Sequence, residues 1–242
     1  MHFEQMAAEY ATARPPYPDL LFDTLELAGA IGPGRRVLEV GAGSGLATVP
    51  ILQRGSEVVA LEPGGQLAAL LTDAAPGASV IVSGLEEAEL PQARFHSAVA
   101  ATALHWVDLS VGLPLIHRAL RPAGLLAVWR TVFGDDTFGS DFRARVAEIV
   151  AQRGRPDDGR SREARPTTTE LTAGGWFEDV RSVRWRWAID LDADRVGRLF
   201  RTFSDWTADE AAQAEQAVVD LGGRVTEHYQ TVLHLLRRVD QT

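Results

Sequence analysis

The stretch VLEVGAGSG, residues 37–45, decides the fold of this chain. Its glycines stand at alternate positions, Gly41, Gly43 and Gly45, after a short apolar run and before a segment with helical periodicity. Glycine at this density marks backbone that turns tightly or lies against a ligand. The segment therefore predicts a strand, a glycine-rich turn and a helix, with a ligand site at the turn.

The same alternation continues on both sides of this stretch. A helix is expected at 20–30, and the apolar and capping patterns then predict strands at 37–40, 57–62, 79–84, 97–104 and 125–133, with helices at 46–53, 65–74 and 108–120 between them. The strands are continuous apolar runs, as buried parallel strands are. We therefore expect an α/β fold with a parallel sheet covered by helices on both faces.

The pattern changes after residue 133. The last part predicts a helix near 140–152, a polar arginine-rich loop at 153–165, a half-buried strand at 180–191, a helix that begins with a capping box at Thr207 and ends at Gly222, and a final strand at 225–238. The whole is expected to form a seven-stranded, mostly parallel sheet with helical cap insertions after the fifth and sixth strands. No linker long enough to separate domains is visible.

Charge and composition exclude several classes of function. The net charge is −9, and the deficit is spread evenly, with 8 Arg against 13 acidic residues in 1–133 and 16 against 20 in 134–242. Without a basic half, the chain is not expected to bind nucleic acid. The absence of cysteine excludes disulfides, thiolate catalysis and cysteine-based zinc sites.

No part of the sequence looks like a membrane or export signal. The first ten residues contain no apolar run or cleavage pattern, and no apolar stretch reaches the ~18 residues that a membrane helix needs. We expect a soluble, cytoplasmic protein with no membrane partner. The sequence carries no signal for its oligomeric state.

The glycine spacing separates two classes of cofactor site. Dinucleotide folds use G-x-G-x-x-G, but the sixth position from Gly41 is Leu46, and no G-K-[ST] follows. A second landmark is Glu62, which ends the second predicted strand 17 residues after Gly45. A carboxylate there can accept hydrogen bonds from both hydroxyls of a ribose.

Five motifs in order resemble those of class I S-adenosylmethionine-dependent methyltransferases. They are VLEVGAGSG (37–45), LEP (61–63), SGLEEAELP (83–91), ATALHWVD (101–108) and LIHRALRPAGLLAVW (115–129). The leader YATARPPYP (10–18) and the later GGWFEDV and WTADEAAQAEQ are similar to the methyltransferase 11 and trans-aconitate-methyltransferase-like small-molecule group. His96 departs from the family pattern, which often has an acidic residue before the fourth strand.

The resemblance implies a Rossmann-like fold whose last strand is antiparallel, S-adenosyl-L-methionine as cofactor, and transfer of its methyl group to a small-molecule acceptor. A sulfonium methyl is already activated, so the enzyme needs only to align a nucleophile in line and exclude water, with no metal. The implied cofactor contacts are Glu39, Gly41, Ala42, Gly43, Gly45, Glu62, Pro63, Leu85, Glu86, Ala101 and Thr102.

The sequence indicates the residues that bind the methyl acceptor less clearly than those that bind the cofactor. Tyr10, Arg14 and Trp106 are expected to contact the substrate, and His105 is the candidate catalytic residue. An unperturbed imidazole titrates near neutrality and can act as a base. We favour a positioning role for His105 over a basic one.

We expect one methyltransferase domain over 1–242. It comprises a leader and helix covering the cofactor (1–34), a cofactor-binding core (35–133) and cap insertions with the last two strands (134–242). Two alternatives remain at this point, an NAD(P)-dependent oxidoreductase on a similar sheet and a non-catalytic protein that binds S-adenosylmethionine. The sequence does not identify the acceptor, or whether oxygen, nitrogen, carbon or a carboxylate is methylated.

Overall fold

A computed structural model describes residues 7–135, 137–153 and 165–240. The chain forms two compact units. The sheet unit comprises residues 16–131, 164–184 and 231–242, and the helical unit comprises residues 1–15, 132–163 and 185–230. The expectation of one domain over 1–242 stays a prediction.

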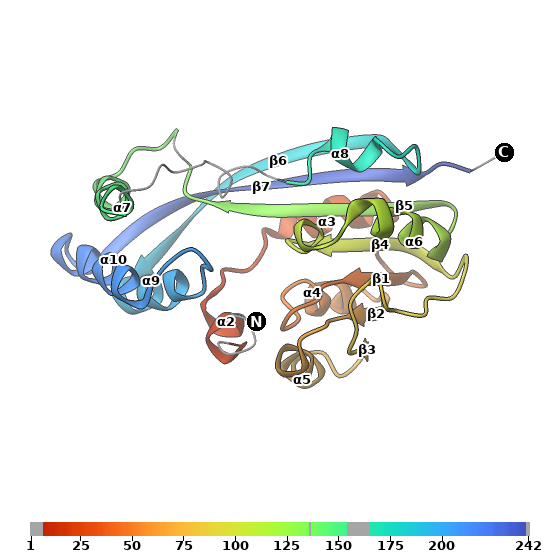
Figure 1. The fold of residues 1–242 in the computed structure, drawn as a ribbon, viewed down its shortest axis with the longest axis horizontal. Coiled ribbons are helices and arrows are strands. Elements are labelled where there is room, and N and C mark those ends of the chain that lie inside the picture. The colour runs from red at the N-terminus through yellow and green to blue at the C-terminus, as the bar shows by residue number, and fades with distance from the viewer. Residues whose placement is uncertain (1–6, 136, 154–164, 241–242) are drawn as a thin grey trace. The chain divides into compact units, whose positions relative to one another are not determined.

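The strands form one seven-stranded sheet in the order β3-β2-β1-β4-β5-β7-β6 (Figure 1). Their bounds are β1 Arg36–Val40, β2 Glu57–Leu61, β3 Ser79–Ile81, β4 Phe95–Ala101, β5 Leu120–Phe133, β6 Phe177–Asp192 and β7 Arg224–Arg238. The pairs β1–β2, β1–β4, β2–β3 and β4–β5 are parallel. The arrow of β7 points against that of β5 in Figure 1, so the sheet is mostly parallel, as expected.

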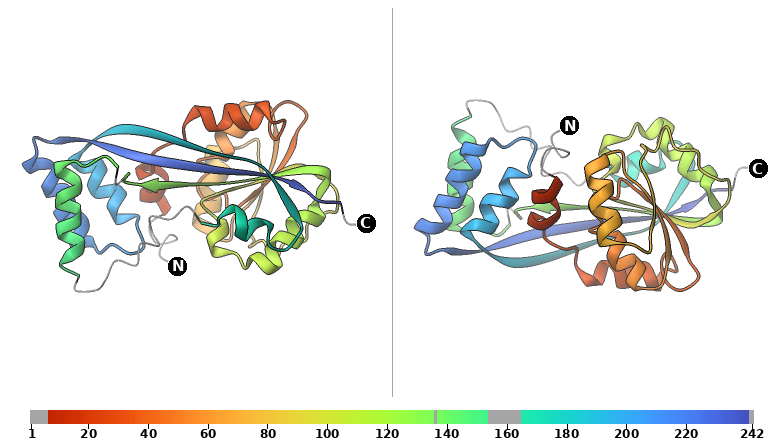
Figure 2. Two further views of the ribbon diagram at one scale, coloured as in Figure 1. Left: turned by 90° about the horizontal axis from the view of Figure 1, so that it is seen from above. Right: turned by 90° about the horizontal axis from the view of Figure 1, so that it is seen from below.

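Helices separate the parallel strands as the sequence predicts. In the sheet unit they are α3 Asp19–Leu27, α4 Thr48–Gln53, α5 Gly65–Ala74, α6 Leu109–Ala119 and α8 Thr168–Thr172. Figure 2 shows α3 and α6 on opposite faces of the sheet. The side chain of Asp108 accepts a hydrogen bond from the backbone N–H of Ser110 and caps α6, which confirms the predicted start of that helix.

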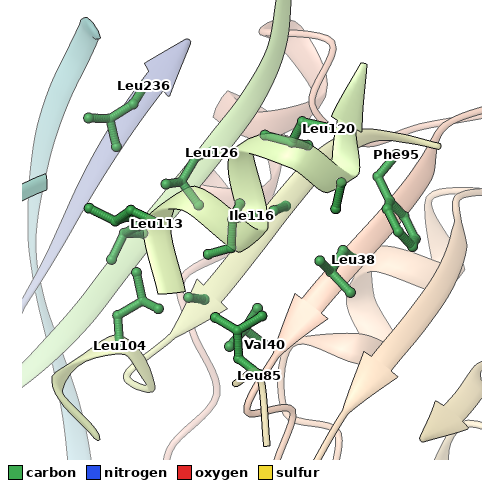
Figure 3. Packing of buried hydrophobic residues seen from close by; sticks show 14 of the residues in the cluster. Leu38, Val40, Leu85, Phe95, Leu104, Leu113, Ile116, Leu120, Leu126 and Leu236 are labelled. Atoms are coloured by element: carbon green, nitrogen blue, oxygen red, sulfur yellow. The ribbon is translucent and has the colours of Figure 1, made fainter. Parts of the chain in front are cut away.

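The α6 face of the sheet carries a continuous apolar core (Figure 3). Leu113 and Ile116 of α6 pack with Leu38 of β1 and Leu126 of β5, and all four side chains are at most 3% exposed. Burying such a side chain stabilises the fold by about 1.5–3 kcal/mol. This core holds the parallel strands in register, so that their carboxyl ends lie along one edge of the sheet.

The segment RPAG, residues 121–124, differs from its prediction as a turn before the fifth strand. It lies inside β5, where Leu120 pairs with Phe95 and Leu125 already pairs with Ser97. The extra residues form a bulge, with Ala123 at a φ of 57°. The predicted turn is therefore an interruption of a longer strand.

The helical unit has its own apolar core. Its helices are α2 Ala7–Ala13, α7 Asp141–Ala151, α9 Ala193–Arg201 and α10 Ala208–Asp220. Their buried side chains include Phe142 of α7, Leu199 of α9 and Val218 of α10. The predicted capping box of Thr207 and Glu210 is confirmed at the start of α10. In chain order α7 follows β5, and α9 and α10 follow β6.

Candidate cofactor and active site

The glycine-rich loop lies between β1 and α4 and is tied to β2. The backbone N–H of Ala42 donates to the carbonyl of Leu61 at 2.9 Å. Gly41 has a φ of +66°, and a Cβ atom there would lie 2.6 Å from the Cβ of Ala103. Gly43 has a φ of +59°, but nothing lies within 4 Å of its Cβ position. The loop therefore needs glycine for its path, and it leaves open space beside Gly43 for a ligand.

Glu62 joins this loop to the end of β2. One carboxylate oxygen accepts from the N–H of Gly43 at 2.7 Å, and the other accepts from the N–H of Gly64 at 2.9 Å. The residue is only 6% exposed. Because each carboxylate oxygen has two lone pairs, Glu62 can hold the loop and still accept bonds from a ligand diol.

Glu39, on β1, is fully buried next to the loop. Its Oε2 accepts from the hydroxyl of Thr48 at 2.7 Å, whereas its Oε1 is buried with no hydrogen-bond partner in the described part of the chain. Burial raises the pKa of Glu39 to about 8, against the lowering effect of Thr48 and with a smaller raising effect of Glu62. A buried acceptor without a donor fits a ligand that supplies one, such as the ammonium group of S-adenosylmethionine.

Backbone strain marks the carboxyl end of β4. Ala101 ends the strand, and Thr102 adopts a φ of 56° although it is not glycine. Its N–H donates to the carbonyl of Trp129 at 2.8 Å, and its hydroxyl lies 3.5 Å from the hydroxyl of Tyr17. Residues in this conformation concentrate at ligand sites. The sequence predicts Ala101 and Thr102 here, and it places Tyr17 in the leader motif 10–18 without assigning it a contact.

His105 and Trp106 follow in the short helix η1 Leu104–Trp106. Their rings lie 4.9 Å apart between centroids, and Trp106 is 67% exposed. Desolvation, with a contribution from the charge of Arg130, lowers the pKa of His105 to about 4. The lowered pKa favours the neutral imidazole at pH 7, and the choice between a positioning and a basic role for His105 stays a prediction.

Three further candidates for contact with the cofactor lie after β3 and just before α5. Leu85 is 2% exposed and packs in the core with Leu104 and Leu113. Glu86 is exposed, and its Oε1 accepts from the N–H of Asp108 at 3.3 Å. Pro63 is exposed beside Glu62. Their predicted contacts with the cofactor stay predictions.

The two leader candidates belong to the helical unit. Tyr10 lies in α2. Arg14 donates to the carbonyl of Thr202 at 3.0 Å, and its guanidinium carbon lies 4.9 Å from the ring centroid of Phe133 and 4.7 Å from that of Phe203. Their predicted role in acceptor binding stays a prediction. The predicted arginine-rich loop, 153–165, falls mostly outside the described residues.

Comparisons with known proteins agree with this arrangement. A family model described as a methyltransferase domain matches residues 38–128. An uncharacterised methyltransferase of Mycobacterium tuberculosis is 34% identical over 170 residues, which cover 70% of this chain and 67% of that protein. A methyltransferase-like protein of Schizosaccharomyces pombe is 25% identical over 209 residues, covering 84% and 77% of the two chains.

Solved structures share the fold. A candidate type II methyltransferase from Anaeromyxobacter dehalogenans superposes with a TM-score of 0.64 at 22% identity, covering 94% of this chain and 99% of the other. Geranyl diphosphate C-methyltransferase from Streptomyces coelicolor, solved with S-adenosyl-L-homocysteine, gives 0.52 at 18% identity, covering 91% and 74%.

The family excludes the oxidoreductase alternative. The cofactor is S-adenosylmethionine. Within the described residues, no helix is long and apolar enough to cross a membrane. The chain belongs to the class I S-adenosylmethionine-dependent methyltransferases.

Proposed function

We propose that this enzyme methylates a small-molecule acceptor by direct in-line displacement. The pair of buried acidic side chains, Glu39 and Glu62, beside the open space at Gly43 supports the methyl-transfer part of the proposal, and the net charge of −9 supports the small acceptor. A cofactor with an ammonium group and a ribose diol satisfies both carboxylates.

The two acidic residues beside the loop have different roles in this scheme. Glu39 would release its proton to solvent when the cofactor binds and would then accept a hydrogen bond from the ammonium group through the oxygen that Thr48 leaves free. Glu62 would hold the ribose hydroxyls while it keeps the loop in place through Gly43. When bound, the cofactor supplies an activated sulfonium methyl group. The protein then contributes alignment and exclusion of water, and alignment alone can lower such a barrier by about 7–11 kcal/mol.

His105 and Trp106 are proposed to position the acceptor at the end of β4. The neutral imidazole of His105 can donate and accept a hydrogen bond without carrying charge. The exposed indole of Trp106 offers an apolar wall. Tyr10 and Arg14 are proposed as further acceptor contacts, and the protein is proposed to act in the cytoplasm.

Charge supports a small acceptor. A chain with a net charge of −9 and no basic half repels the phosphate backbone of nucleic acid. A fold neighbour is named for a small acceptor, geranyl diphosphate, although at 18% identity that similarity concerns the fold alone.

Methyl-labelled S-adenosylmethionine tests the proposal directly. The purified enzyme is incubated with an extract of its source organism, and the products are separated into small molecules, protein and nucleic acid. We expect label in the small-molecule fraction with wild type and little with Glu62→Ala. Label that enters only protein or nucleic acid would overturn the proposal of a small acceptor.

A further inference from the structure

A basic groove lies in the sheet unit at the amino ends of the parallel strands. Arg35 precedes β1, His96 is the second residue of β4, Arg121 is the second residue of β5, and Arg237 lies near the end of the antiparallel β7. The groove has a volume of about 600 Å³. The cofactor site lies at the carboxyl ends of the same strands, so the two sites are separate.

His96 is held between two hydrogen-bond donors. Its Nδ1 accepts from the backbone N–H of Arg36 at 2.9 Å, and its Nε2 lies 2.7 Å from a guanidinium nitrogen of Arg121. Burial, together with the charges of Arg121 and Arg35, lowers the pKa of His96, which favours the neutral ring. A neutral ring that accepts at Nδ1 carries its proton on Nε2, so an N–H of His96 faces an N–H of Arg121.

The arginines of the groove have little negative charge to neutralise them. Among the residues that the structure describes, neither Arg35 nor Arg121 forms an ion pair with a carboxylate. Arg237 lies 3.7 Å from Glu178, and both of those side chains are about half exposed. Glu57 is the other carboxylate whose charge reaches His96. The groove therefore gathers donors without matching acceptors, in a chain whose net charge is negative.

The rest of the groove is apolar. Leu125, Val180 and Leu235 contribute to its lining, and Val180 is 41% exposed. Gly29 leaves room for Arg35, because a Cβ atom at Gly29 would lie 3.3 Å from a guanidinium nitrogen of Arg35. The volume falls within the range of small-molecule sites, about 300–1,000 Å³.

We propose that this groove binds a small organic oxyanion, a phosphate or a carboxylate, that carries an apolar group. Arg121 turns from His96 Nε2 toward the anion, so that both groups donate hydrogen bonds to the anion instead of facing each other. Arg35 and Arg237 neutralise its charge, since guanidinium groups match the geometry of both anions. The apolar part lies against Leu125 and Val180. The proposal is independent of the acceptor chemistry.

Calorimetric titration with phenyl phosphate, phenylacetate and inorganic phosphate tests the groove. We expect saturable binding of phenyl phosphate or phenylacetate that is tighter than that of inorganic phosphate, and the tighter of the two identifies the anion. Arg121→Gln and, separately, Arg35→Gln should weaken this binding at least about tenfold, because each removes a charged donor. Arg145→Gln, an exposed arginine of α7 that changes the net charge equally, should leave it unchanged.

Binding of S-adenosylhomocysteine serves as the check on folding and should be the same in all of these variants. The proposal is overturned if none of the three anions binds saturably up to about 10 mM. It is overturned equally if binding persists in both groove variants, or if Arg145→Gln weakens it as much as they do.

Discussion

Glu39 is a buried acid whose second oxygen has no hydrogen-bond donor in the described part of the protein. Its ionisation therefore makes the stability of the folded protein depend on pH. Its folded-state pKa of about 8 lies above the ordinary 4.5, so the folded protein binds this proton more tightly than the unfolded chain does. Its stabilising effect is complete below about pH 4.5 and is lost as the pH rises through about 8.

Glu39→Gln removes this titration while it keeps an acceptor for Thr48. We therefore expect the difference in melting temperature, variant minus wild type, to grow from pH 5 to pH 9 in the absence of cofactor. Thermal unfolding measured across that range checks it. A difference that stays constant with pH would show that Glu39 is ionised in the folded protein throughout.

His105 is expected to position the acceptor, and the kinetics of His105→Ala separate this role from a basic one. A positioning role predicts a higher KM for the acceptor with kcat little changed, and His105→Gln should restore part of the loss because it keeps hydrogen-bonding capacity. A base with a pKa of about 4 would lose activity only as the pH falls through that value. A fall in kcat beyond about a hundredfold, with loss of that acidic limb, would contradict the positioning role.

At this scale the sequence identifies residues but not their partners. The places of Glu39 and Glu62 beside the loop could be predicted from their spacing to the glycines, and their contacts with the cofactor stay predictions. Thr48, Tyr17 and Arg130 could not be predicted, because their importance depends on contacts with Glu39, Thr102 and His105 that only the folded chain creates.

At the scale of elements, the glycine-rich loop makes the sharpest prediction. A valine at Gly43 would place a branched side chain in the space that the ligand needs. Gly43→Val should weaken binding of S-adenosylhomocysteine at least about a hundredfold, with the loss measured by calorimetry.

The matched control is Gly223→Val, in the turn before β7. Gly223 also has a positive φ and open space around its Cβ position, so the backbone strain is similar. This variant should lose stability but bind the ligand as wild type does. Equal losses of binding in the two variants would mean that strain, and not the site, explains the effect.

The parallel strands and the helices between them could be predicted because their apolar runs and caps are local signals. The bulge at 121–124 could not be predicted, because a proline and a glycine in the sequence fit both a turn and an interrupted strand. The short helices α8 and α9 were also not predicted. Helix α9 has buried side chains, Val196 and Leu199, that pack in one apolar cluster with side chains of α7 and α10.

The whole molecule carries a net charge of −9, which predicts its behaviour toward nucleic acid. Methyl transfer to bulk DNA or RNA in a filter assay should stay at background at both low and high salt. Transfer that is clear at low salt and falls as salt rises would reveal a phosphate-binding surface and contradict the prediction.

The central claim is that the loop at 41–45, with Glu62, binds S-adenosylmethionine. Titration of S-adenosylhomocysteine into wild type, Glu62→Ala and Glu57→Ala tests it most directly, because Glu57 is an exposed acid at the opposite end of the same strand. We predict a loss of about 2–4 kcal/mol of binding free energy for Glu62→Ala, which removes acceptors for two hydroxyls, and none for Glu57→Ala. Wild-type affinity in a folded Glu62→Ala protein would place the cofactor elsewhere.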